Sequence, residues 1–248
     1  MDGSALMKHQ LRRALFWSVV ALPFGGTLLV AGGYRGRVEL GSISGSVRFT
    51  GTAPNAEIVD LSTDAYCLAA HPGEVVVTRP ILTDAAGGLS DVIVYVKAGA
   101  PVGELPLPSE PAVLDQEGCE YSPRVVALRV GQTMVIRNSD ATLHNVHVSA
   151  QENRSFNIGQ PLRGIESRRT FQNPEVGIGV KCDIHGWMTA VIGVFDHPFF
   201  AITSVDGSFT LDDLPPGEYV VEAWHKTLGS QVQTITVAEG AVEASFVF

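Results

Sequence analysis

The sequence from Lys181 to Met188, Lys-Cys-Asp-Ile-His-Gly-Trp-Met, decides the fold, and three of its side chains can bind a soft metal. Upstream, the stretch from Asn138 to Val146 reads Asn-Ser-Asp-Ala-Thr-Leu-His-Asn-Val and supplies another histidine. One thiolate, two imidazoles and a weak thioether are the donors of a trigonal copper site with a long axial sulfur, which cycles between Cu(I) and Cu(II). The two stretches therefore predict a copper site that transfers electrons.

Alternation of apolar residues places the cysteine at the end of a strand. Every second residue before it shares its face, which is typical of a half-buried strand: Val176, Ile178, Val180 and Cys182. The residues that follow lack this alternation and contain Gly186, so we expect a loop that bends His185 and Met188 back towards Cys182.

The upstream stretch has the same organisation. Residues 133–137 and 143–148 are predicted as strands, and the polar run 138–142 is predicted as the loop between them. His144 then lies where this loop meets its strand.

The two stretches resemble the copper-binding segments of the cupredoxins, the plastocyanin and amicyanin family of small blue copper proteins. The early match comprises Asn138, His144, Asn145 and Val146. In the late match, two residues separate each neighbouring pair of Cys182, His185 and Met188, which is most similar to amicyanin. The resemblance covers roughly residues 123–196.

This resemblance implies one type 1 copper ion per chain, with His144, Cys182, His185 and Met188 as its ligands. It makes Asn145 the residue that ties the two ligand segments together. It also implies that the ring edge of His185 reaches the surface beside Trp187, in an apolar patch where a redox partner docks, with Pro161 and Leu162 as neighbours.

Other interpretations of the same residues stay open. A Cys and His pair also binds zinc, although structural zinc sites rarely include Met. Two further functions stay open: a periplasmic copper carrier in which the same ligands capture copper, and an interaction module whose metal is structural. We expect no enzyme, because Cys182 is the sole cysteine of its loop and its neighbours are Lys181 and Asp183 rather than histidines.

The remaining cysteines and histidines give further expectations. Cys67 and Cys119 are candidates for a disulfide in an exported protein, and two buried free thiols are the alternative. His147 has the opposite strand parity to His144, so we expect it to face away from the copper. With His197 and His225 it forms either a second metal site or a hydrogen-bonded interface.

The N-terminus predicts export. Basic residues precede the uncharged stretch 14–33, which is long enough for a signal peptide or an inner-membrane anchor, so the bulk of the chain is expected to be periplasmic or extracytoplasmic. Removing residues 1–33 leaves 14 basic and 25 acidic residues, a net charge of −11. This excess argues against nucleic acid and favours a redox protein partner, such as a cytochrome or a membrane redox complex, with a basic docking face.

Strand patterns and turn residues predict an all-β chain. We divide it into a signal peptide or anchor at 1–36, an N-terminal β region at 37–122, a cupredoxin core at 123–197 and a small β-sandwich at 198–248. The last part resembles the carboxypeptidase-regulatory or transthyretin-like modules, through Asp206-Gly207 and Pro215-Pro216-Gly217 between alternating runs. The stretch 43–51 has a similar first-strand pattern, so the N-terminal β region is expected to pack partly with this module.

Overall fold

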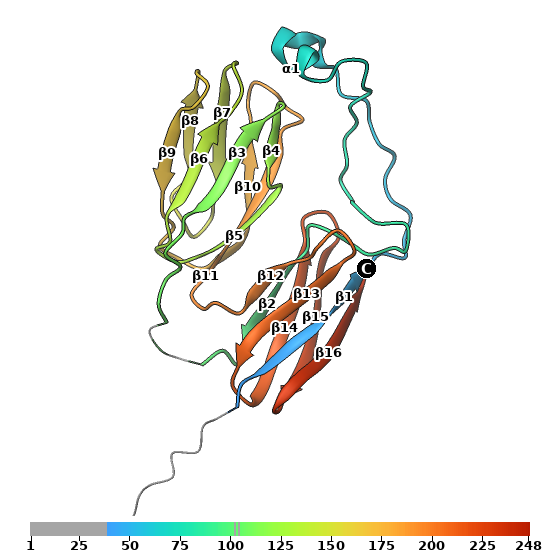
Figure 1. The fold of residues 1–248 in the computed structure, drawn as a ribbon, viewed down its shortest axis with the longest axis vertical. Coiled ribbons are helices and arrows are strands. Elements are labelled where there is room, and N and C mark those ends of the chain that lie inside the picture. The colour runs from blue at the N-terminus through green and yellow to red at the C-terminus, as the bar shows by residue number, and fades with distance from the viewer. Residues whose placement is uncertain (1–38, 102, 104) are drawn as a thin grey trace, which may run out of the picture. The chain divides into compact units, whose positions relative to one another are not determined.

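The computed structural model describes residues 39–248 except 102 and 104 (Figure 1). Strands make up nearly all of its regular structure, which confirms the predicted all-β class. The predicted N-terminal helix or signal lies outside the described residues. Among the residues described, no helix combines the length and apolar character needed to cross a membrane.

Nine strands form two facing sheets, which we call sandwich A. They are β3 (Ala112–Glu117), β4 (Glu120–Ser122), β5 (Val125–Arg129), β6 (Met134–Asn138), β7 (His144–Ser149), β8 (Phe156–Gln160), β9 (Glu166–Arg169), β10 (Glu175–Lys181) and β11 (Thr189–Phe195). One sheet has the order β5-β11-β10-β7-β8 and the other β4-β3-β6-β9. Apolar side chains from both sheets, such as Ile136 of β6 and Ile178 of β10, share one buried core.

Seven strands form the second pair of sheets, sandwich B. They are β1 (Gly41–Arg48), β2 (Ile93–Ala98), β12 (Phe200–Ile202), β13 (Ser208–Leu214), β14 (Gly217–His225), β15 (Gly229–Val237) and β16 (Gly240–Val247). The sheet orders are β13-β1-β16 and β12-β2-β14-β15. Because β1 pairs with β16 and β2 with β14, both ends of the described chain build this sandwich, and sandwich A is inserted between β2 and β12.

The predicted boundary at residue 123 needs a correction. Strands β3 and β4 lie within the range 37–122, yet they belong to sandwich A, because β3 forms a parallel ladder with β6 from Ala112 to Gln116. Sandwich A therefore begins at Ala112, and the expected N-terminal β region is divided between the two sandwiches.

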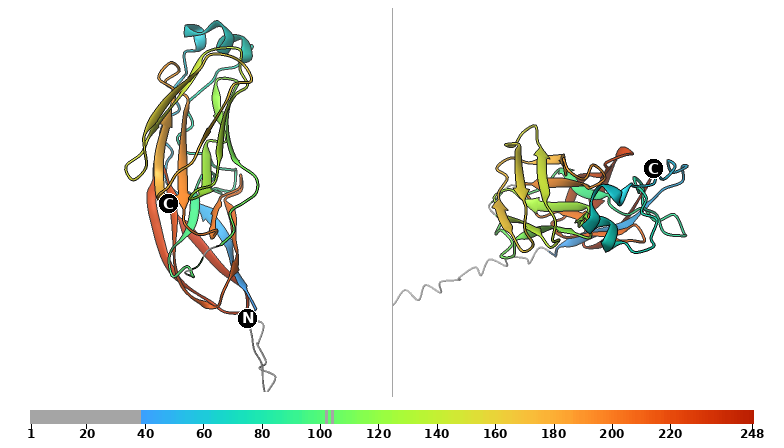
Figure 2. Two further views of the ribbon diagram at one scale, coloured as in Figure 1. Left: turned by 90° about the vertical axis from the view of Figure 1, so that its left-hand side faces the viewer. Right: turned by 90° about the horizontal axis from the view of Figure 1, so that it is seen from above.

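A short helical segment between β1 and β2 closes one end of sandwich A. We call residues 60–71 the cap; it contains the 3-10 helix η1 (Leu61–Thr63) and the helix α1 (Ala65–Ala70). Each helix begins at an aspartate whose side chain accepts backbone N–H groups, Asp60 for η1 and Asp64 for α1. A disulfide between Cys67 and Cys119 joins the cap to sandwich A, and α1 lies beyond the strand ends of this sandwich in Figures 1 and 2.

Candidate metal centre

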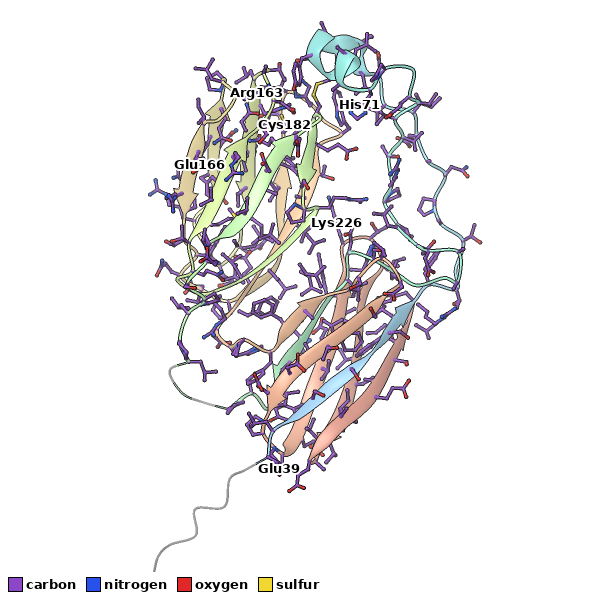
Figure 3. The ribbon with its side chains drawn as sticks, in the orientation of Figure 1. Glu39, His71, Arg163, Glu166, Cys182 and Lys226 are labelled. Carbon is purple, nitrogen blue, oxygen red and sulfur yellow. A yellow bond between two sulfur atoms is a disulfide. The ribbon has the colours of Figure 1, made fainter. Side chains whose placement is uncertain are left out.

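The loop after β10 folds tightly on itself. The backbone N–H of Cys182 donates to the carbonyl of Met188 at 3.1 Å, and the N–H of Met188 donates to the carbonyl of His185 at 2.9 Å. The N–H of His185 points at the Cys182 sulfur, 3.4 Å away. These bonds hold the thiol and the imidazole of the loop on the same side, at the end of sandwich A where Figure 3 labels Cys182.

The pairing of β7 with β10 brings the upstream histidine to the same point. His144 is the first residue of β7, and Lys181 of β10 pairs with His147 of β7. The Nδ1 atoms of His144 and His185 lie 2.9 Å apart, and these two residues and Cys182 each place one donor atom within 4.8 Å of the others. All three side chains are buried, with exposed fractions of 0 to 1%.

The outer edges of both rings face carboxylates. His144 Nε2 is 2.9 Å from Asp140 Oδ2, and His185 Nε2 is 3.2 Å from Asp64 Oδ2. A carboxylate only accepts hydrogen bonds, so each Nε2 carries the proton and the Nδ1 of each neutral ring has a free lone pair. Two lone pairs facing each other in a buried site repel, and a cation between them removes the repulsion. The donor set therefore fits a metal ion.

Burial lowers the pKa of His144, and the hydrogen bond from its ring to Asp140 opposes this effect. The charge of the neighbouring His185 lowers the pKa of His144 further. A depressed pKa keeps the ring neutral near pH 7, which is the state that a metal ligand requires.

Asn145 joins the two ligand segments, as the resemblance implies. Its Oδ1 accepts the backbone N–H of Asp183 at 2.7 Å and lies 3.3 Å from the Cys182 sulfur. Its Nδ2 donates to Asn157 and to the carboxylate of Asp183. The amide is therefore fixed from both sides, and the thiol is held where the two segments meet.

Met188 is fully buried in the same core cluster as Cys182. Its backbone closes the loop, as described above. The role of its sulfur as the axial donor stays a prediction.

The expectation that His185 presents a ring edge to the solvent is wrong, because this side chain is only 1% exposed. The cap covers it: Asp64 contacts its Nε2, and the Cys67 sulfur lies 3.7 Å from the same atom. Trp187 is half-buried against the core, and its indole N–H donates to the carbonyl of Cys119. Leu162 remains exposed.

Trp187 and Met188 also line an open cleft of about 510 Å³. Its other walls include Arg124 and the turn that contains Lys226. The loop after β10 is thus closed by the cap on one side and borders this cleft on another.

The structure does not bring His147, His197 and His225 together into a cluster with metal-ligand geometry, among the residues that it describes. His147 faces away from His144 and contacts the carboxylate of Asp183 at 3.0 Å. His197 Nε2 donates to the carbonyl of Val96, and His225 Nδ1 accepts backbone N–H groups from Thr227 and Leu228.

The sequence interpretation missed Asp64 and Asp140. Asp140 lies within the quoted upstream stretch, four residues before His144, and its loop position resembled that of an ordinary turn residue. Asp64 directly precedes the run Ala65–Ala70, and an aspartate before such a run is an N-cap signal. That signal indicates a helix start but does not indicate the contact with His185.

Neither the family models nor the curated proteins contain a match to this chain. Solved structures do match. A copper-containing nitrite reductase from Thermus scotoductus is 25% identical with a TM-score of 0.34, and the match covers 40% of this chain and 25% of that one. The chain thus spans about a quarter of the reductase.

Two smaller proteins match nearly over their whole length. A purple cupredoxin from Nitrosopumilus maritimus is 23% identical, covering 34% of this chain and 98% of its own, with a TM-score of 0.29. A mutant of amicyanin in its Cu(I) form is 19% identical, covering 41% and 97%, with a TM-score of 0.31. The resemblance of residues 198–248 to carboxypeptidase-regulatory modules stays a prediction.

Proposed function

We propose that this chain is an extracytoplasmic type 1 copper protein that carries single electrons between redox partners and is not an enzyme. The observation that carries the proposal is the buried convergence of His144 Nδ1, His185 Nδ1 and Cys182 Sγ, with both outer ring nitrogens already occupied by carboxylates. Met188 would complete the donor set from within the same core.

The donor set favours copper over zinc. One thiolate, two imidazoles and a thioether suit a metal that alternates between Cu(I) and Cu(II), whereas closed zinc sites recruit additional Cys or His ligands. When bound, copper would supply a one-electron couple. The chain's own residues exclude water from this point and hold the donors in one arrangement through the loop hydrogen bonds and Asn145.

Two observations support the compartment and partner that we propose. The disulfide between Cys67 and Cys119 suits an oxidising environment outside the cytoplasm. The acidic excess, a net charge of −9 over the whole sequence, suits a redox partner with a basic face, such as a cytochrome or a membrane redox complex. Since the cap covers His185, we place the docking site for this partner at Trp187, beside the cleft.

The competing functions are a copper carrier and a module with a structural metal. A carrier releases copper to an acceptor, but here the donors are buried beneath a disulfide-linked cap. The test is voltammetry of the copper-loaded chain together with transfer of copper to a competing chelator. We expect a reversible one-electron wave and slow transfer. Rapid transfer without a reversible wave would establish the carrier, and a metal that is redox-silent would establish the structural role.

A further inference from the structure

The two histidines of the centre are each held by an aspartate from outside the expected ligand set. Asp64 belongs to the cap and lies 121 positions from His185 in the sequence. Asp140 lies in the loop before β7. Among the described residues, neither carboxylate forms a hydrogen bond with Cys182 or Met188.

Asp64 divides its two oxygens between two tasks. Oδ1 accepts the backbone N–H groups of Tyr66 and Cys67 and so begins α1. Oδ2 accepts from His185 Nε2 at 3.2 Å and from the Thr142 hydroxyl at 2.8 Å. Four hydrogen-bond donors thus hold this carboxylate in place.

Asp140 is buried more deeply than Asp64, with an exposed fraction of 1%. Its Oδ2 accepts from His144 Nε2 at 2.9 Å and from the backbone N–H of Cys119 at 2.8 Å. Its Oδ1 accepts the N–H of Gly118 at 2.8 Å and the hydroxyl of Tyr66 at 3.2 Å.

The disulfide connects the two carboxylates. The backbone N–H of Cys67 donates to Asp64, and the backbone N–H of Cys119 donates to Asp140. Each half of the cystine thus binds the aspartate that holds one histidine. Hydrogen bonds thus link the cystine to both aspartates at the outer edges of the two rings.

We propose that Asp64 and Asp140 are positioning residues that hold His185 and His144 with Nδ1 towards the metal and that favour Cu(II) over Cu(I). This inference rests on the proposed copper function and adds the device that tunes it. A carboxylate that accepts the outer N–H makes an imidazole a more basic ligand. It also adds negative charge near the metal in a site of low dielectric, which stabilises the more highly charged ion.

The first experiment compares Asp64→Asn and Asp140→Asn with the wild type in the full-length chain. Asparagine also begins helices, so Asp64→Asn can keep the N-cap of α1 while removing the charge at His185. Asp60→Asn is the matched control, because Asp60 caps η1 in the same segment and, among the residues that the structure describes, its side chain bonds only to Ser62.

We expect the Cu(II) affinity of each variant to fall about 10- to 100-fold, with a smaller loss for Cu(I). Each tenfold loss of Cu(II) affinity relative to Cu(I) affinity raises the reduction potential by about 59 mV for one electron. The control should keep the wild-type potential. The inference is overturned if both variants bind copper with an unchanged potential.

A second experiment needs no copper and keeps the inference testable if Asp140→Asn does not fold. Long-range ¹H–¹⁵N correlation spectra of the metal-free wild type should show both histidines protonated at Nε2, and Asp64→Asn should shift the resonances of His185 but not those of His144. Protonation at Nδ1, or an unshifted His185, would contradict the inference. Absence of a copper–thiolate band in the wild type would instead refute the proposed function. The nitrogen spectra would still show whether the two aspartates accept hydrogen bonds from the histidine Nε2 atoms.

Discussion

Cys182, His144 and His185 meet because strand register and loop hydrogen bonds fix their backbones. The loop places two donors three residues apart, and the pairing of β7 with β10 supplies the third from a distant part of the sequence. Asn145 directly follows His144 in β7, and its side chain accepts a hydrogen bond from the backbone of Asp183.

Met188→Leu tests the axial donor. The side chain is fully buried, and leucine conserves most of its volume, so we expect a stability change below about 1.5 kcal/mol. Loss of the thioether disfavours Cu(II), so the potential should rise while the thiolate band remains. Voltammetry and visible spectra of the variant measure both effects, and an unchanged potential would remove Met188 from the donor set.

The proximity of Cys182 and His185 could be predicted from the sequence because their spacing is local and because alternation before Cys182 indicates a strand. Their role as metal ligands stays a prediction. The exposure of His185 could not be predicted. It depends on Asp64, and nothing in the local sequence of either residue encodes a contact over 121 positions. The fold class followed from strand patterns, whereas the boundary at Ala112 depends on a parallel ladder between β3 and β6.

The cap covers the candidate centre, and a disulfide attaches it to sandwich A. Cys67 and Cys119 are 52 positions apart. Closing a loop of this length stabilises a fold by about 4 kcal/mol in the chain-entropy model. The cap itself is short, with six residues in α1, so it depends on this link and on the contacts of Asp64 and Tyr66 with sandwich A.

Replacing both Cys67 and Cys119 by serine should therefore release the cap. We expect the free energy of unfolding to fall by about 4 kcal/mol, and His185 should become reactive towards diethylpyrocarbonate in the metal-free chain. Leu68→Ala, on the exposed face of α1, is the control and should change neither property. A double variant in which His185 stays protected would show that the cap is held without the disulfide.

Glu175 at the start of β10 fastens the neighbouring loop. Its carboxylate accepts the backbone N–H groups of Gln151, Glu152 and Asn153. Burial alone would raise its pKa, but these bonds and the amide of Asn153 outweigh burial and lower the pKa below the ordinary value. A lowered pKa in the folded state means that the stabilisation is present above the unfolded pKa of about 4.3 and is lost as the pH falls through the folded value.

Glu175→Gln should accordingly destabilise the chain at pH 7 by about 1 kcal/mol, a value reduced by partial exposure to solvent. The difference from the wild type should shrink as the pH falls below about 4. Urea unfolding at several pH values measures this difference. A difference that does not depend on pH would mean that the charge of Glu175 is not what holds the loop.

Each of the two sandwiches has an apolar core of its own. The core of sandwich A includes the candidate ligands Cys182 and Met188, and in the core of sandwich B Phe246 packs against Phe209. Because β1 and β2 precede sandwich A in the sequence and β12–β16 follow it, folding of sandwich B brings the two ends of the inserted sandwich together.

Phe246→Ala tests whether the metal centre is independent of sandwich B. Removing this buried ring should cost about 3 to 5 kcal/mol and lower the melting temperature, while the copper spectrum at 25 °C stays unchanged. Val247→Ala, at an exposed position of the same strand, should alter stability by no more than about 0.5 kcal/mol. A copper spectrum altered by Phe246→Ala alone would show that sandwich B shapes the centre.

The most direct test of the copper assignment is visible and electron paramagnetic resonance spectroscopy of the copper-loaded full-length chain and of its Cys182→Ser variant. We expect a strong thiolate-to-Cu(II) band with a small copper hyperfine splitting in the wild type, and loss of this band when Cys182 is replaced. A colourless wild-type protein that retains stoichiometric zinc would contradict this expectation.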